Sequence, residues 1–202
     1  MDNKAFFKLT YGLFLLTAKN DTKDNGCIIN TAIQVANNPT RISIAVQKGN
    51  LTHDMIKSTG IFNICSLSVK ADFSLFQHFG MQSGRDTDKF ADFTDIARSD
   101  NGLIYLTTGS NMYMSATVTE CIDLGSHSLF IAEVTDATVL TKDESCSYTY
   151  YQNYIKPQPA LQTKKSTWVC SVCGYVYEGG ELPEDFECPL CHHPKEDFVL
   201  QS

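Results

Sequence analysis

Short apolar runs alternate with turn residues through the first three quarters of the chain, a pattern typical of β-strands. Two turn signals, at residues 24–26 (Asp-Asn-Gly) and 38–39 (Asn-Pro), lie between the early runs. The pattern therefore predicts a set of antiparallel strands. The predicted strands cover residues 9–18, 28–36, 41–47 and 61–67.

Two short helices interrupt this strand pattern. Thr52 is predicted as the N-cap of a helix that continues through Lys57 and is ended by Gly60. A second helix is predicted over residues 71–79. Both are short, so they decorate a β-structure and do not form a bundle.

A long hairpin is predicted in the second half of the strand-rich segment. Residues 112–124 and 128–140 are strand-like and flank Gly125-Ser126-His127. Many strands with few helical periods predict a mainly β protein, an antiparallel barrel with short helices.

The chain divides near residue 160. Pro157, Pro159 and the stretch 160–166 lack a hydrophobic period, which is typical of a linker. We therefore expect a barrel domain at 1–155, a linker at 156–165 and a small domain at 166–202.

Charge and hydropathy exclude some classes of partner. The net charge of −7 argues against nucleic acid, which needs clustered Lys and Arg. No apolar run approaches the roughly 20 residues of a membrane span, and the first residues lack the features of a secretory signal. We expect a cytoplasmic protein with neither a nucleic acid nor a membrane as its partner.

Eight cysteines change the picture most. Four are isolated, and the other four form Cys-x-x-Cys twice, with 14 residues between the pairs. Four thiolates from two such turns can surround one metal ion, and about 35 residues need that ion to be stable. The spacing suits both iron and zinc. The predicted ligands are Cys170, Cys173, Cys188 and Cys191.

Three motifs surround these cysteines: Trp-Val-Cys-Ser-Val-Cys-Gly-Tyr-Val-Tyr-Glu-Gly at 168–179, Leu-Pro-Glu-Asp-Phe-Glu-Cys-Pro-Leu-Cys at 182–191, and Pro-Lys-Glu-Asp-Phe at 194–198. With these motifs the second domain resembles rubredoxin, in the short form found as a module of rubrerythrins. The resemblance implies an Fe(Cys)₄ centre that carries one electron, with zinc as a possible substitute. His192 stands where the family usually has glycine, and a positive φ there would strain it somewhat.

The first domain contains five motifs in a fixed order, at 9–18, 25–34, 50–54, 83–90 and 123–134. Through them it resembles the flavin reductase-like, FMN-binding split-barrel family over about residues 5–155. A flavin barrel followed by rubredoxin resembles the high-molecular-weight rubredoxins. The resemblance implies a homodimer with FMN near the subunit interface.

An FMN phosphate needs hydrogen-bond donors and positive charge. Thr52 and the first amides of its predicted helix can supply the donors, and Asn50 belongs to the same motif. Lys48, Arg85 and Lys89 are candidate cations. Each of these residues also has an ordinary alternative, as a helix cap or a solvated surface charge.

The flavin ring needs a polar edge and close backbone approach. Asn30 and Thr31 can bond the ring edge, although they also read as a plain strand end. Ser83-Gly84 can let the backbone come close. No Gly-x-Gly-x-x-Gly fingerprint is present, so a nicotinamide would stack on the flavin itself. His127 is the candidate contact, by likeness to the family's Gly-x-His element.

These features predict an electron relay. NAD(P)H would reduce FMN, and the rubredoxin iron would pass single electrons to an external acceptor of the flavodiiron or rubrerythrin type. One rival is a flavin or ferric reductase with an accessory rubredoxin. The other is a zinc-stabilised binding module on a flavin barrel.

Overall fold

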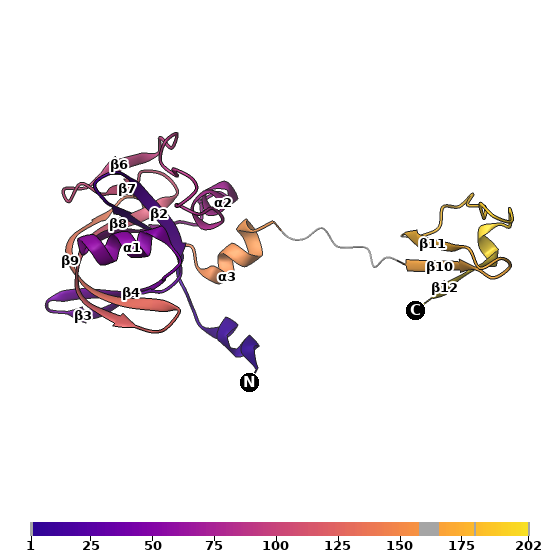
Figure 1. Cartoon of the computed structure of the whole chain (residues 1–202), viewed down its shortest axis with the longest axis horizontal. Helices are drawn as coiled ribbons and strands as arrows, with labels where there is room; N and C mark the ends of the chain where they lie inside the picture. The colour runs from indigo at the N-terminus through magenta and orange to yellow at the C-terminus, as the bar shows by residue number, and fades with distance from the viewer. Residues whose placement is uncertain (1, 158–165, 180, 202) are drawn as a thin grey trace. The chain divides into compact units, whose positions relative to one another are not determined.

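The computed structural model describes residues 2–157, 166–179 and 181–201. The chain forms two compact units, Met1–Pro157 and Gln158–Ser202. Figure 1 draws both, and each is described by itself. Most of the linker expected at 156–165 lies outside the described residues. No helix in the described part is long and apolar enough to cross a membrane.

A seven-stranded antiparallel sheet forms the first unit, in the order β2-β1-β5-β8-β9-β4-β3. The sequence predicted a mainly β fold, and this is confirmed. The strands are β1 (Phe14–Lys19), β2 (Asp24–Ile29), β3 (Ala32–Asn37), β4 (Thr40–Gln47), β5 (Ile61–Leu67), β8 (Ser110–Asp123) and β9 (His127–Val139).

The two edges of this sheet are β2 and β3, which are consecutive in the chain. Only Asn30 and Thr31 separate them, so the sheet has to curl until its edges meet at one side. The result is a barrel that stays split between β2 and β3. Helix α1 (Leu51–Thr59) packs against the curved sheet, with Met55 and Ile56 in its core.

Two predicted turn and cap positions are wrong. Residues 24–26 open strand β2, where Gly26 pairs with Thr17, and the true turn precedes them. There the Asn20 side chain accepts hydrogen bonds from the backbone N–H groups of Thr22 and Lys23. An Asx turn therefore replaces the expected Asp-Asn-Gly turn.

Helix α1 begins one residue after Asn50, which has extended backbone angles and is the N-cap. Thr52, predicted as the cap, lies in the first turn, and its hydroxyl accepts a hydrogen bond from Asn25. Gly60 ends the helix with a φ of 73°, as the sequence predicted.

The remaining described elements of this unit lie outside the seven-stranded sheet. Helix α2 packs against β2. A second hydrophobic core forms around Phe76 and Phe79 of this helix and Tyr151 of η2. Strands β1 and β5 are therefore buried on both faces. These elements are η1 (Asn3–Lys8), α2 (Phe73–Gly80), β6 (Ile96–Arg98), β7 (Ile104–Leu106), α3 (Tyr148–Tyr150) and the π-helical turn η2 (Tyr151–Ile155).

The second unit is a three-stranded sheet in the order β11-β10-β12. Among the described residues of this unit, the buried apolar core consists of Cys170, Cys188 and Phe198, with partly buried aromatic side chains around them. So small a core predicts that a metal stabilises the fold. The elements are β10 (Ser166–Cys170), β11 (Val176–Gly179), η3 (Lys195–Asp197) and β12 (Phe198–Gln201).

Replacing Gly60 with alanine tests the end of α1. A Cβ at Gly60 meets no atom within 4 Å, so the cost comes from the positive φ alone. We expect Gly60→Ala to lower the free energy of unfolding by about 1 kcal/mol. Gly49→Ala is the control, because its Cβ also meets nothing within 4 Å and its φ is not left-handed. Equal losses in urea denaturation would contradict this assignment.

Candidate functional site

A cavity of about 240 Å³ lies between strand β2, the first turn of α1 and the end of α2. The loop that follows α2 forms its fourth side. The cavity is smaller than most whole-ligand pockets, so it suits one part of a cofactor. Its lining residues are Asn25, Cys27, Ile28, Gln47, Gly49, Asn50, Leu51, Thr52, Phe79, Gly80, Gln82, Ser83, Gly84 and Lys89.

Five of the predicted cofactor residues meet at this cavity. They come from two segments that are distant in the chain, residues 50–52 and 83–89, and the fold brings them together. The backbone and side chains there are polar, as a phosphate or sugar would need. The five are Asn50, Thr52, Ser83, Gly84 and Lys89.

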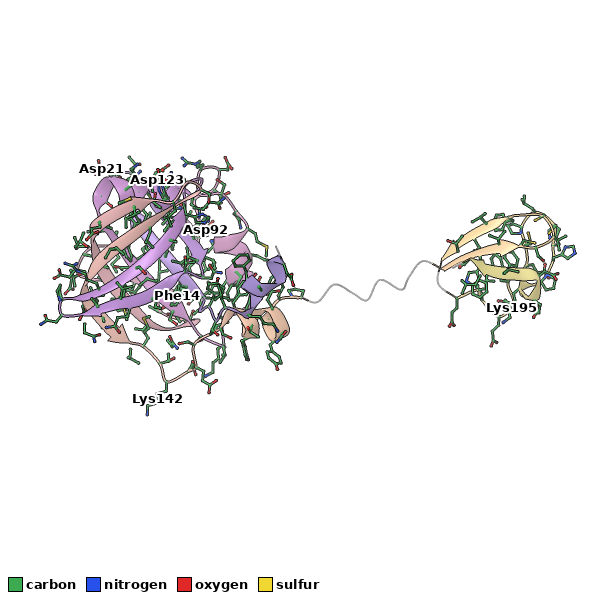
Figure 2. All side chains as sticks on the ribbon, turned by 90° about the horizontal axis from the view of Figure 1, so that it is seen from below. Phe14, Asp21, Asp92, Asp123, Lys142 and Lys195 are labelled. Carbon is green, nitrogen blue, oxygen red and sulfur yellow. The ribbon has the colours of Figure 1, made fainter. Side chains whose placement is uncertain are left out.

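The other four predicted cofactor residues do not line the cavity. Asn30 and Thr31 form the link between the split edges, and the Thr31 hydroxyl donates to the Ala45 carbonyl at 2.8 Å. Lys48 pairs with Asp123 at 2.6 Å. Figure 2 labels Asp123, whose side chain is exposed. Arg85 pairs with Asp54.

Asn25 is a cavity residue that the sequence reasoning missed, because Asn-Gly was taken for a turn. Its amide Nδ2 donates to the Thr52 hydroxyl at 2.9 Å, which ties β2 to α1. Within the described part of the chain, its buried Oδ1 has no hydrogen-bond partner. An unpaired buried acceptor at a cavity indicates a missing donor, such as a ligand hydroxyl or N–H.

Gly84 is required where it stands. A Cβ there would overlap the side-chain amide of Asn25. Lys23 holds the same loop, since its Nζ donates to the carbonyls of Gly84 and Thr87 at 2.6 and 3.0 Å. The loop therefore approaches the Asn25 side chain with the backbone of Gly84, where there is no room for a side chain.

Lys89 brings a buried positive charge to the cavity. Its Nζ donates to the carbonyls of Gly26 and Phe79, both at 2.9 Å. Among the described residues no carboxylate pairs with it. Burial lowers the pKa of Lys89 and raises that of the neighbouring Cys27 thiol. An anionic ligand group would supply the missing counter-charge.

His127 lies at the start of β9, and it does not line this cavity. Its Nδ1 is 2.9 Å from the Ser126 hydroxyl, and its side chain is partly exposed. The structure thus leaves its predicted contact with nicotinamide as a prediction.

The four predicted metal ligands converge in the second unit. Their sulfur atoms all lie within 4.8 Å of one another. Two of the separations are 3.7 Å (Cys170 to Cys191) and 3.4 Å (Cys173 to Cys188). A tetrahedron with ligand bonds of about 2.3 Å has edges of about 3.8 Å, so the cluster fits one thiolate-bound ion.

Backbone N–H groups surround these sulfurs. Burial would raise the pKa of Cys188, but hydrogen bonds from the N–H groups of Cys191 and Leu190 help to lower it to about 6. Burial and the neighbouring thiols raise the pKa of Cys191 to about 12, so a bound metal would be needed to hold all four sulfurs as thiolates. His192 has a φ of 57° beside this site, the positive value anticipated from the glycine it replaces.

Comparison with protein families identifies both units. The model for the flavin reductase like domain matches residues 6–157. The chain belongs to the flavin reductase like family. The model for the rubrerythrin, rubredoxin-like domain matches residues 168–199, in the second unit.

Relatives extend this result. The high molecular weight rubredoxin of Moorella thermoacetica is 35% identical over 98% of this chain and 99% of its own length. The ferric-chelate reductase (NAD(P)H) of Archaeoglobus fulgidus is 30% identical over 75% of this chain and 89% of its own. The chain thus joins a flavin reductase-like oxidoreductase domain to a rubredoxin-like one.

A solved structure supports the barrel fold. The NADH:FAD oxidoreductase SgcE6 of Streptomyces globisporus matches with a TM-score of 0.63 and 21% identity, over 70% of this chain and 82% of that one. The residues of the cavity fit a flavin-binding member of this fold. The unpaired Oδ1 of Asn25 and the buried ammonium of Lys89 would be satisfied by a ligand that carries hydrogen-bond donors and a negative charge.

Replacing Gly84 with alanine tests the cavity. The added Cβ must displace Asn25, so we expect the dissociation constant for flavin to rise at least about tenfold. Gly60→Ala is the control, because Gly60 does not line the cavity and its Cβ meets nothing within 4 Å, so it lowers stability without touching the flavin site. Unchanged flavin fluorescence quenching in Gly84→Ala would show that flavin binds elsewhere.

Replacing Cys188 with serine tests the metal cluster. We expect Cys188→Ser to lose the ferric-thiolate absorbance and most of the bound iron, because one of four ligands is gone. Cys121→Ser is the control, since Cys121 is an exposed cysteine outside the cluster. Full iron content in Cys188→Ser would refute this ligand set.

Proposed function

We propose that this chain is an NAD(P)H-dependent flavoenzyme that passes electrons through FMN to a rubredoxin iron and on to an external protein. One observation carries the proposal: a single chain joins a flavin reductase-like cavity to a complete four-cysteine cluster. The full-length likeness to a high molecular weight rubredoxin supports the same pairing.

The FMN would be held mainly by the cavity's polar groups. The backbone N–H groups at the start of α1, with Thr52 and Asn50, would receive the phosphate. Lys89 supplies positive charge close by, and Ser83 and Gly84 offer backbone at contact distance. Asn30, Thr31 and Lys48 lie outside the cavity and could bond only parts of the cofactor that extend beyond it. Arg85 also lies outside it, but it directly follows Gly84, which lines the cavity, and its side chain could reach a phosphate held at the cavity's edge. When bound, the flavin supplies the exchange between hydride transfer and single-electron transfer.

NAD(P)H is the proposed electron donor. The ferric-chelate reductase relative is named for NAD(P)H, which favours a nicotinamide over other donors. We place His127 beside the nicotinamide, because it opens β9 in the motif that resembles the family's Gly-x-His element. Its partly exposed imidazole is free of the core and can contact a bound ligand.

The second unit would hold iron in its four thiolates and deliver electrons outward. Residues 166–202 carry seven acidic side chains and one lysine. Such a surface favours a partner with a basic docking face, of the flavodiiron or rubrerythrin type. Tethering also raises the local concentration of this unit near the flavin.

A homodimer is the proposed assembly. Ile33 and Val35 on the sheet edge β3 are 66% and 51% exposed. An apolar edge strand is unfavourable in water and is commonly covered by a partner.

A ferric reductase is the second candidate. It rests on the 30% identity to a ferric-chelate reductase over the barrel. In that case the barrel would reduce a chelate directly, and the rubredoxin-like unit would be accessory.

An anaerobic NADH titration followed by absorbance tests the proposal. In the full chain we expect both the flavin band and the ferric-thiolate band to bleach without added flavin. A chain ending at Pro157 should keep flavin reduction and lose transfer to an external acceptor.

Other outcomes separate the alternatives. A ferric-thiolate band that persists after the flavin has bleached would favour the second candidate, a ferric reductase with an accessory rubredoxin-like unit. If neither band bleaches, NADH is not the donor. If the protein binds metal without a ferric band, the metal is zinc and the relay fails.

A further inference from the structure

A buried histidine that does not line the cavity links helix α1 to strand β9 directly, and to the loop after α2 through Asp54. His53 is 3% exposed and lies in the first turn of α1. Its ring centroid is 5.6 Å from the ring centroid of Phe130. Its Nε2 is 2.9 Å from the hydroxyl of Ser128, and its Nδ1 is 3.0 Å from Oδ1 of Asp54. The other carboxylate oxygen of Asp54 accepts a hydrogen bond from Arg85 at 2.6 Å.

The hydrogen bonds of Asp54 determine which ring nitrogen of His53 carries a proton. The Arg85 guanidinium and the His53 ring lower the pKa of Asp54, so its carboxyl is ionised and can only accept. Nδ1 of His53 must therefore carry the proton. In the neutral ring with this tautomer, Nε2 accepts a hydrogen bond from the Ser128 hydroxyl.

This arrangement bears on Arg85. Its backbone follows Gly84, which lines the cavity, and its side chain is about half exposed. The contact with Asp54 uses Nη2 and leaves other guanidinium N–H groups for a ligand. Without Asp54, a long exposed arginine would sample many rotamers, and ordering it on binding would cost entropy.

We propose that His53 is a positioning residue that acts through Asp54 to hold Arg85 at the rim of the cavity for the phosphate of a phosphorylated flavin. The inference rests on the proposed function, which places a flavin there. In this proposal the hydrogen bonds from Ser128 through His53 to Asp54 orient the Arg85 side chain before the phosphate binds. Ser128 anchors the other side of the ring.

Binding of FMN and riboflavin to the full-length chain, freed of flavin, tests this role. The two probes differ only in the phosphate, so a residue that acts through Arg85 should affect FMN alone. We expect His53→Leu and Asp54→Asn to weaken FMN binding by about tenfold and to leave riboflavin within about twofold. His53→Asn keeps a donor near the Nδ1 position and should recover part of the FMN affinity.

Matched serine variants control for the loss of a buried hydrogen bond. Ser128 and Ser115 are 3% and 2% exposed, and both lie on the β8–β9 hairpin. Ser115 bonds Asn63 at 2.8 Å, away from the cavity. Ser128→Ala should weaken FMN binding selectively, and Ser115→Ala should not.

Several results would overturn the inference. Equal losses for FMN and riboflavin would show a merely structural role for His53. Tighter FMN binding in Asp54→Asn would show that this carboxylate competes with the phosphate for Arg85. Should His53→Leu fail to fold, the half-exposed Asp54 still decides the question. A wild-type chain that binds neither flavin would refute the proposed function as well, whereas unaltered FMN binding in the variants refutes only this inference.

Discussion

Strands β2 and β3 are the two edges of the seven-stranded sheet, yet only Asn30 and Thr31 separate them in the chain. So short a link forces the sheet to curl, and the curl places β2 against the first turn of α1. The hydrogen bond from Asn25 to Thr52 closes that contact. The candidate flavin cavity lies where strand, helix start and the loop at Ser83-Gly84 meet.

Charge then decides what the cavity can accept. Lys89 is buried with two carbonyls and, among the described residues, no carboxylate partner. Asn25 offers an unpaired acceptor. Leaving both groups buried costs free energy that a polar, anionic ligand would recover. The second unit follows the same logic, because its few buried residues surround four thiols that a metal would stabilise.

Local signals carried much of the sequence prediction. Strand β5 was placed at its observed bounds, and Gly60 ended α1 as expected, because both depend on neighbouring residues. The four metal ligands were also found, since each pair lies in one short turn. Thr52 and Asn25 were misjudged for the opposite reason: their roles arise from a contact between segments 27 residues apart.

The same limit applies to the candidate site. Lys89 and Gly84 reach the cavity, while Lys48 and Arg85 pair with Asp123 and Asp54. Side-chain type alone does not separate these cases, because a lysine or arginine finds its partner only in the folded chain. His53 and Asp54 belong to the motif at 50–54, but the contact of His53 with Ser128 depends on a strand 75 residues away.

The central claim is that the flavin reductase-like and rubredoxin-like units exchange electrons within one molecular assembly. The rate at which NADH bleaches the ferric-thiolate band, measured by stopped flow over a wide range of protein concentration, tests this most directly. An internal relay predicts a rate that is independent of protein concentration, because the tether sets the encounter. A rate that rises in proportion to protein concentration would contradict the account, since the units would then meet only by diffusion between molecules.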